Sequence, residues 1–438
     1  MAGVAAVAAE RPANARAGHE RWIVCALLFF ATTINYVDRQ ILSLLKGTLD
    51  AELGWTNQQF GLVNAAFQGA YGLGLLGFGW FVDRFGTRIG YAVSIAAWSV
   101  AAMGHALVGS VRGFFLARAS LGLGEAGNFP SAIKSVALWF PARERAFATA
   151  LFNSGTNVGA IIAPATIPFV AAAWGWRSAF VVAGALGFVW LAAWWLFYEE
   201  PERQRRVSAG ELAYIRAGRA AGSNAREPWG SLLGRRQTWA FVVAKFLTDP
   251  VWWFFLIWLP DFFRKTRGLD IKKSWIHLVT IYAIVTVLSI AGSWATGALA
   301  RSGWSITRAR KTSLLAAALA VLPILWVTRA SDWGAVLLIG LAGAAHQAWS
   351  ANLFTTVSDV FPKSAVASVV GIGGMAGSVG GMLFPPFAGA ILDHYEAAGS
   401  AAPGYAILFG ICASAYLVAF AIHQALAPRL EPLAPEAA

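Results

Sequence analysis

The sequence is poor in charge and in cysteine. Only 13% of its 438 residues are Asp, Glu, Lys or Arg, which is about half the share that soluble globular domains carry. Its two cysteines, Cys25 and Cys412, both lie in apolar segments, where each is expected to pack as a small hydrophobe. These scarcities exclude an ordinary soluble enzyme, a disordered protein and a secreted disulfide scaffold, and they provide no cysteine framework for a metal.

Long apolar runs dominate the chain instead, since 58% of its residues are hydrophobic. A membrane-spanning helix needs about 20 mostly apolar residues. The sequence therefore predicts an all-α polytopic membrane protein with twelve transmembrane helices arranged as two six-helix pseudo-repeats. The predicted spans lie near 22–45, 58–81, 89–109, 113–139, 146–173 and 177–197, and then near 238–263, 275–299, 311–328, 333–358, 365–392 and 404–427.

The distribution of Lys and Arg predicts the orientation. These residues concentrate in the loops that would face the cytoplasm if both termini were inside. The loop after the seventh run is an exception, because it holds Arg264, Lys265, Arg267, Lys272 and Lys273. We expect a multi-pass protein of a bacterial inner membrane with both termini cytoplasmic. Its expected parts are a cytoplasmic tail at 1–20, a six-helix bundle at 21–198, a cytoplasmic linker at 199–236, a second six-helix bundle at 237–428 and a cytoplasmic tail at 429–438.

The net charge of +12 bears on the partners. A basic balance can serve nucleic acid, an anionic lipid surface or an acidic substrate. The basic residues lie in short loops and form no continuous stripe, so no nucleic-acid binding is expected. The expected partners are the lipid bilayer and a small anionic substrate, and the linker at 199–236 is expected to lie as an amphipathic tether on the inner leaflet.

The two groups of runs repeat one another. Phe140-Pro141 and Phe361-Pro362 end the fourth and tenth runs at an offset of 221 residues, and Val158-Gly159 and Val379-Gly380 recur at the same offset. Such duplication is typical of transporters that hold their substrate between the halves, near mid-membrane.

A charged loop joins the second and third runs. Gly79, Asp83, Arg84, Gly86 and Arg88 form the pattern G-x-x-x-D-R-x-G-x-R. The glycines allow a tight turn and close helix approach, Asp83 can face a positive helix N-terminus, and the arginines can lie among headgroups. The loop resembles the hallmark gating loop of the major facilitator superfamily. A corresponding loop after the eighth run lacks the aspartate.

Charged residues also lie inside predicted spans of the first half. Arg118 and Glu125 share one face of the fourth run, in a stretch that resembles a second motif of the superfamily, R-x-x-x-G-x-G. Asp38 and Arg39 are adjacent in the first run, and helical neighbours point about 100° apart, so different partners are expected. The simplest arrangement pairs Asp38 with Arg118 and turns Arg39 toward a cavity; a purely structural ion pair is the alternative.

Further motifs narrow the resemblance. The runs at 125–130, 139–145, 153–155 and 175–177 resemble the anion:cation symporter branch of the superfamily, and the runs at 345–350 and 357–362 look like hexuronate transporters. The resemblance implies that Asp38 and Glu125 carry the coupling protons, that Arg39 binds a carboxylate and that Arg118 is the partner of an acid. It also implies substrate contacts in the first half at Tyr36, Tyr71, Asn153, Thr156 and Asn157.

The second half has its own candidates. His346 lies 221 residues after Glu125, as if each half contributed a titratable group to one site, and Gln347 and Trp349 belong to the same run of substrate candidates. Lys245 and Asp249 stand at i and i+4, so they either neutralise each other or Lys245 gives a second cation to the substrate. Packing is the competing interpretation for His346 and for the polar residues of the fifth run.

Together these features predict a secondary active transporter that imports a sugar-acid anion, such as glucuronate or galacturonate, by proton symport through alternating access. An enzyme is not expected, because the sequence has no G-x-S-x-G, H-E-x-x-H or phosphate-loop motif. No cofactor other than protons, no metal and a functional monomer are expected. The alternatives are the same fold carrying an aldonate, glucarate, tartrate or an aromatic acid and, more remotely, a membrane receptor that binds a sugar acid without moving it.

Overall fold

The computed structural model describes residues 18–217, 229–361 and 363–431. Every regular element in these ranges is a helix, as predicted. Ten helical segments are long and apolar enough to cross a membrane. The two other predicted spans are also helical, since the fourth falls on α4 (Val111–Glu125) and α5 (Asn128–Trp139) and the tenth on α14 (Asp332–Val360).

The first half of the chain contains two short connecting helices and several divided spans. Gly86 separates two spans within α3, at φ 80° and ψ 167°, a conformation that is essentially restricted to glycine. The fourth span is interrupted at 126–127 and the fifth at Ser154. Besides α4 and α5, the elements are α1 (Glu20–Leu44), α2 (Lys46–Leu53), α3 (Asn57–Gly104), η1 (His105–Leu107), α6 (Ala142–Asn153), α7 (Gly155–Trp174) and α8 (Trp176–Phe197).

The second half consists mostly of long helices. Besides α14, its elements are α11 (Arg236–Arg267), α12 (Ile271–Arg301), α13 (Ile306–Val321), η2 (Leu322–Trp326), α15 (Lys363–Ala397) and α16 (Ala402–Leu426). Between the halves the linker forms α9 (Ala209–Ala217) and α10 (Trp229–Leu233). The expected terminal tails lie largely outside the described residues, as does 218–228 of the expected linker.

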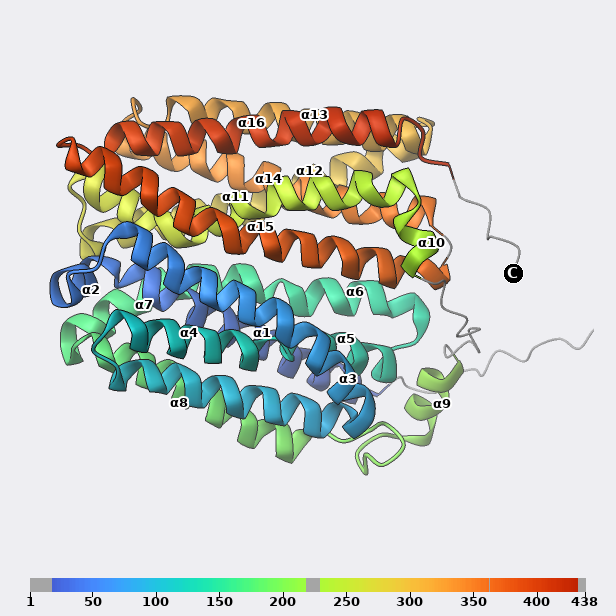
Figure 1. Ribbon diagram of the computed structural model, residues 1–438. Helices are drawn as coiled ribbons and strands as arrows, with labels where there is room; N and C mark the ends of the chain where they lie inside the picture. The colour runs from blue at the N-terminus through green and yellow to red at the C-terminus, as the bar shows by residue number, and fades with distance from the viewer. Residues whose placement is uncertain (1–17, 218–228, 362, 432–438) are drawn as a thin grey trace, which may run out of the picture.

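The two halves lie side by side with their helices roughly along one axis (Figure 1), with α2 at one end and α9 and α10 at the other. Between the halves, α3 packs against α15 and α7 packs against α12. Glycine allows the first of these contacts to be close, because a Cβ on Gly61 would lie 2.6 Å from the carbonyl carbon of Pro385. The junction is therefore tightest near the α2 end.

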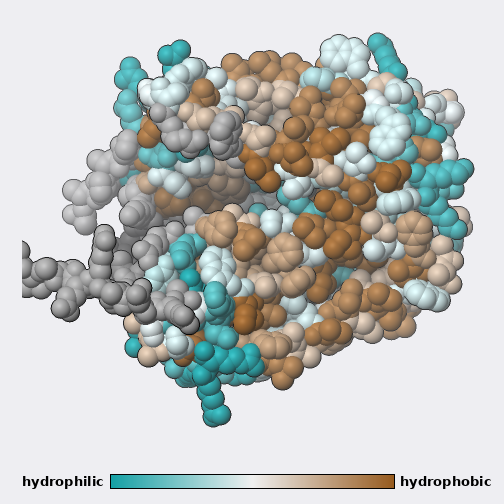
Figure 2. Space-filling model, turned by 180° about the vertical axis from the view of Figure 1, so that it is seen from behind, coloured by the Kyte–Doolittle hydropathy of each residue, from teal (hydrophilic) through white to brown (hydrophobic). Residues whose placement is uncertain are grey.

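The outer surface carries many large apolar side chains, including Leu116, Val189, Leu196, Ile290 and Leu383. Figure 2 shows broad apolar areas on both halves and a hollow between them that deepens toward the end bearing α9 and α10. Apolar surface of this extent is unfavourable in water and fits the hydrocarbon of a bilayer.

The linker helix α9 is tied to the first half of the chain. Glu211 is buried and accepts hydrogen bonds from the backbone N–H and the guanidinium of Arg21, the latter over 3.1 Å. Arg21 also pairs with Glu144 at 3.0 Å, and the Tyr214 hydroxyl donates to the same Glu144. Buried charged and polar contacts thus anchor this part of the linker to α1 and α6 of the first half. Its contact with lipid stays a prediction.

Candidate functional site

A polar cavity of about 190 Å³ lies between the two halves. It is lined by α1 and the α6–α7 junction from the first half and by α11 and α14 from the second. The interruption at Ser154 lets side chains on both sides of it reach the same wall. The lining residues are Tyr36, Asn153, Thr156, Lys245, Asp249, Trp252, Trp253, His346, Gln347 and Ser350.

Arg39 and Glu125 form a buried ion pair next to this cavity. Arg39 Nε donates to Glu125 Oε2 over 2.7 Å. Aromatic rings surround the guanidinium, a favourable environment for a cation, and their centroids lie 4.7 Å (Tyr71), 5.1 Å (Tyr36), 5.2 Å (Phe67) and 5.5 Å (Trp253) from its carbon. Tyr36 and Trp253 line the cavity as well, so they connect Arg39 to it.

The expected ion pair between Asp38 and Arg118 is not formed. Arg118 Nη2 donates instead to the backbone oxygen of Arg39 at 3.1 Å and to Asn64 Oδ1 at 3.2 Å. Both carboxylate oxygens of Asp38 are buried and accept no hydrogen bond within the described ranges. The rotation of α1 is the reason, because it aims Arg39 at Glu125 and its neighbour points about 100° away. Arg118 thus braces the backbone of α1.

Lys245 and Asp249 form the second ion pair of the cavity. Lys245 Nζ lies 2.7 Å from Asp249 Oδ2, and both residues line the cavity. The pairing that the i, i+4 spacing predicts is therefore confirmed, and Lys245 lines the cavity while it is paired. The helix is not broken here, since α11 continues through Pro250.

His346 is held by side chains from two other helices. Its Nδ1 lies 2.7 Å from the Tyr416 hydroxyl, and its ring stacks on Trp252 with centroids 5.4 Å apart and an interplanar angle of 6°. Sequence reasoning missed Tyr416, which belongs to an apolar run without a motif. The length and hydropathy of that run reveal a span, but they carry no information about which side chain meets α14.

Four predicted substrate contacts are not among the residues that line the cavity, namely Arg39, Tyr71, Asn157 and Trp349. Arg39 lies next to the cavity, with the ring of Tyr71 against its guanidinium. Trp349 is fully buried and packs edge-on against Tyr416 at 5.6 Å. On a helix it points about 60° outside the arc shared by His346, Gln347 and Ser350. Asn157 is half-buried on α7, away from the residues that line the cavity.

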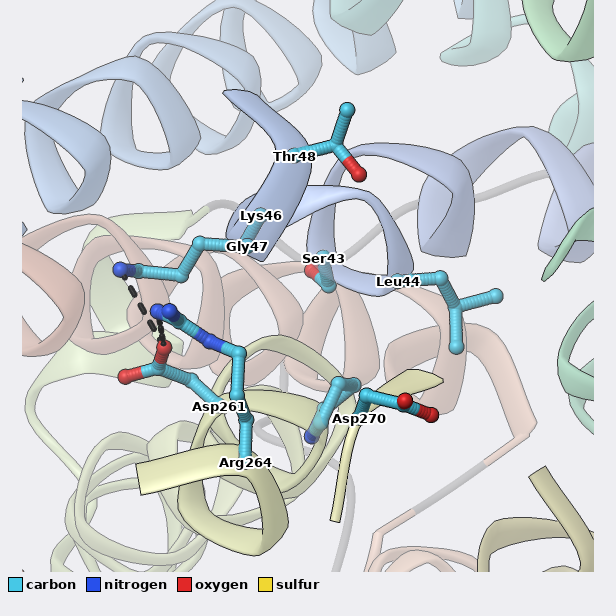
Figure 3. A pocket seen from close by; sticks show the side chains of 9 residues that line it. Ser43, Leu44, Lys46, Gly47, Thr48, Asp261, Arg264 and Asp270 are labelled. Atoms are coloured by element: carbon cyan, nitrogen blue, oxygen red, sulfur yellow. Dashed lines mark hydrogen bonds and ion pairs between the residues drawn. The ribbon is translucent and has the colours of Figure 1, made fainter. Parts of the chain in front are cut away.

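A network of charges joins the halves at the α2 end, around a second cavity of about 140 Å³ (Figure 3). Asp261 lies at its centre, 3.4 Å from Lys46 and 2.5 Å from Arg264, and it accepts a hydrogen bond from Tyr405 at 2.8 Å. Arg264 also reaches Asp50 at 2.5 Å. These contacts connect α2 of the first half to α11, and α11 to α16.

Neighbouring contacts extend the network to α3 and α15. Asp393 accepts from the backbone and side chain of Asn57 at 2.8 and 2.9 Å, and Lys265 bonds both Asn57 and Glu396. Within the described ranges, the ion pairs between the two bundles lie at this end, and so do the hydrogen bonds that Asn57 and Gln58 make with α11 and α15. Three of the five basic residues that depart from the positive-inside rule, Arg264, Lys265 and Arg267, are thus paired with acids.

The pattern at 79–88 is only partly explained by contacts. Gly86 supplies the predicted tight turn, but a Cβ on Gly79 would meet nothing within 4 Å in the described ranges, so the expected close approach is absent there. Arg88 pairs with Glu199 and accepts from Trp194 through its backbone oxygen at 3.0 Å. Arg84 is exposed, and the side chain of Asp83 lies outside the described part.

Known proteins give a consistent comparison. The family described as Major Facilitator Superfamily matches residues 28–385. The chain is 33% identical to the hexuronate transporter of Escherichia coli (strain K12) over 384 residues, which cover 85% of this chain and 88% of that protein. It is 33% identical to the galacturonate transporter of Dickeya chrysanthemi over 257 residues, covering 58% and 74%. The crystal structure of a D-xylose-proton symporter superposes with a TM-score of 0.76 at 15% identity, over 94% of this chain and 99% of that one.

Proposed function

Because the chain belongs to the Major Facilitator Superfamily, we propose that this membrane transporter imports a sugar-acid anion, a hexuronate such as glucuronate or galacturonate, by proton symport. The relatives named above support the cargo class. The observation that carries the proposal is the cavity between the halves, which has a paired cation on each side and neutral hydrogen-bonding groups between them.

Arg39 is the proposed carboxylate ligand. Its guanidinium is fixed by aromatic faces and by Glu125, and a planar guanidinium matches a carboxylate in a bidentate manner. Asn153, Thr156 and Gln347 provide donors and acceptors for sugar hydroxyls, and the ring of Trp252 or Trp253 offers an apolar face for the sugar. Lys245 is available for a second acidic or hydroxyl group of the substrate.

Glu125 and Asp38 are the proposed proton carriers. A substrate carboxylate that binds Arg39 competes with Glu125 for the same cation, so protonation of Glu125 relieves the competition. Asp38 has no partner for its buried oxygens within the described ranges, and a buried carboxylate without a partner is far more favourable when protonated. Import of an anion against a negative-inside potential needs at least one proton for each substrate charge.

The position of the inter-bundle contacts supports transport by alternating access. We assign the α2 end to the outside and both termini to the cytoplasm of a bacterial inner membrane, in accord with the positive-inside rule. The charge network around Asp261 then closes the outer entrance, and it must separate when the halves rock to admit substrate. Each chain encloses its own cavity between two halves, so a monomer is the proposed functional unit.

Uptake by purified protein in proteoliposomes tests the proposal. With the pH gradient and the potential set independently, labelled glucuronate or galacturonate should accumulate when protons can flow inward. Uptake that does not depend on the pH gradient would contradict proton coupling. Competition by aldonates, aldarates, tartrate and aromatic acids identifies the preferred cargo, and saturable binding without any uptake would favour a receptor.

A further inference from the structure

His346 is the one imidazole that lines the central cavity among the described residues, and three helices of the second half fix its ring. It is carried by α14, stacked on Trp252 of α11 and hydrogen-bonded to Tyr416 of α16. Trp349 in turn packs edge-on against the Tyr416 ring. The ring can neither tilt away from Trp252 nor turn about its axis without losing the bond to Tyr416, so its orientation is strongly restricted.

The hydrogen bond between Tyr416 and His346 determines which imidazole nitrogen carries the proton. Both groups are buried, and the Tyr416 hydroxyl has no other hydrogen-bond partner within the described ranges. If Nδ1 carried the hydrogen and donated it, the tyrosyl O–H would have no acceptor, and a buried donor without an acceptor is costly. The favoured arrangement therefore has Tyr416 donating to Nδ1, which leaves the hydrogen of the neutral imidazole on Nε2.

The cavity favours a neutral imidazole over an imidazolium. An imidazolium would place hydrogens on both nitrogens and oppose the donation from Tyr416. The carboxylate that lines the same cavity, Asp249, is already paired with Lys245, so the lining provides no free anion to stabilise a second positive charge. Nε2 has no hydrogen-bond partner in the part of the chain that the structure describes, so its N–H is available to a bound molecule.

We infer that Tyr416 is a positioning residue that holds His346 as a neutral Nε2–H donor for an oxygen acceptor of the transported sugar acid, a hydroxyl or carboxylate oxygen. This inference rests on the proposed function for the identity of the ligand, whereas the assignment of the tautomer does not. His346 then contributes specificity for oxygen-rich substrates from the second half, and it carries no coupling proton.

The tautomer can be measured without substrate. Nitrogen NMR of protein labelled at histidine should show His346 with an unprotonated Nδ1 and a protonated Nε2, and His346→Gln identifies its signal by loss. In Tyr416→Phe the Nδ1 signal should shift as the bond disappears. An Nδ1–H tautomer or an imidazolium at neutral pH in the unaltered protein would overturn the inference, whatever the substrate proves to be.

A double-mutant cycle on uptake tests the functional part. Tyr416→Phe should raise KM about fivefold to tenfold with little change in Vmax, the loss expected when one hydrogen bond is weakened. In the His346→Gln background, whose amide can still donate into the cavity but does not need Tyr416, the same substitution should change KM by less than about twofold. Equal effects in both backgrounds would show that Tyr416 is merely structural and would overturn the inference.

Tyr282→Phe is the matched control. Tyr282 is a buried tyrosine of the second half that packs against the same Trp252 at 6.4 Å, and its hydroxyl makes no hydrogen bond in the described ranges. The KM of the Tyr282→Phe variant should equal that of the unaltered protein. If the unaltered protein takes up none of the sugar acids, the proposed function fails, and the NMR measurement still decides the tautomer.

Discussion

At the scale of single residues, the central question is how a cation that is already paired can bind an anion. Arg39 is buried with Glu125 at 2.7 Å, so its charge is neutralised before substrate arrives. A substrate carboxylate can compete only if the enclosed acid gives up its charge. In the proposed mechanism, the pair links substrate binding to protonation at one position, with residues of the first half alone.

Glu125→Gln should separate binding from coupling. The amide keeps an acceptor for Arg39 Nε but leaves the guanidinium without a counter-charge, and unpairing a buried charge costs about 3–5 kcal/mol. The variant should therefore melt at a lower temperature without substrate. A sugar acid restores the missing charge, so the rise in Tm on adding substrate should be larger than in the unaltered protein. Exchange of labelled for unlabelled substrate should persist, whereas accumulation driven by a pH gradient should be lost.

Glu144→Gln is the control for that substitution. Glu144 is also paired with an arginine, Arg21 at 3.0 Å, but it lies at the α9 end and away from the cavity. Its variant should show no added response of Tm to substrate and should keep gradient-driven accumulation. If the two variants respond alike to substrate, Arg39 is not the carboxylate ligand.

The motifs could identify Arg39 and Glu125 as candidates, but they could not pair them. Adjacent residues on α1 differ in direction, and the sequence contains no information on the rotation of α1 against α4. The rotation of α14 against α16 is likewise not encoded in any motif. This is why Trp349 was expected at the cavity while Tyr416 was missed. The sequence predicts which residues are too polar to face the bilayer. Which of these residues contact one another depends on tertiary packing, which the sequence pattern does not contain.

At the scale of elements, the spans were predictable because apolar length is a local property. Each predicted run overlaps a helix, yet the interruptions at 126–127 and at Ser154 were not foreseen. Within a bilayer a broken helix is tolerated where neighbouring helices satisfy the freed backbone groups. Such support comes from residues far away in the chain, so a single apolar run does not reveal where it bends.

Gly86→Ala tests the turn between the second and third spans. At φ 80° and ψ 167° an alanine is strained by about 1–3 kcal/mol, although the nearest atom to its Cβ, Glu200 Oε1, is 3.6 Å away. The variant should lower Tm and slow transport, because the turn sets the angle between the two spans. Gly79→Ala is the matched control from the same motif, since its Cβ meets nothing within 4 Å in the described ranges. Equal losses in both variants would refute a special role for the turn.

At the scale of the whole molecule, the two halves touch in two different ways. Apolar helix faces pack along α3–α15 and α7–α12, while polar contacts between the bundles, within the described ranges, gather at the α2 end. Apolar faces can slide with little change in energy, but ion pairs are either formed or separated. The charge network around Asp261 is therefore the element expected to set the balance between closed and open outer entrances.

Asp261→Asn should shift that balance toward the open outer entrance. The buried carboxylate holds Lys46 and Arg264, and its neutral replacement leaves these cations of opposite halves to share Asp50 as a counter-ion. The opening can be detected with Ser43→Cys as a reporter, because Ser43 lines the cavity at the α2 end and is buried. With Cys25 and Cys412 replaced by alanine, a charged thiol reagent should label this cysteine several-fold faster when Asp261 is substituted.

Glu52→Gln is the control for the labelling experiment with Asp261→Asn. Glu52 lies at the same end and pairs with Arg177 at 2.8 Å, but both residues belong to the first half and are exposed. The Trp176 indole and Arg177 hold the pKa of the Glu52 carboxyl below its usual value, so the pair is charged at neutral pH. Removing it takes away an ion pair without releasing a contact between halves, and the labelling rate should stay unchanged. Faster labelling in both variants, or in neither, would mean that the network does not control the outer entrance.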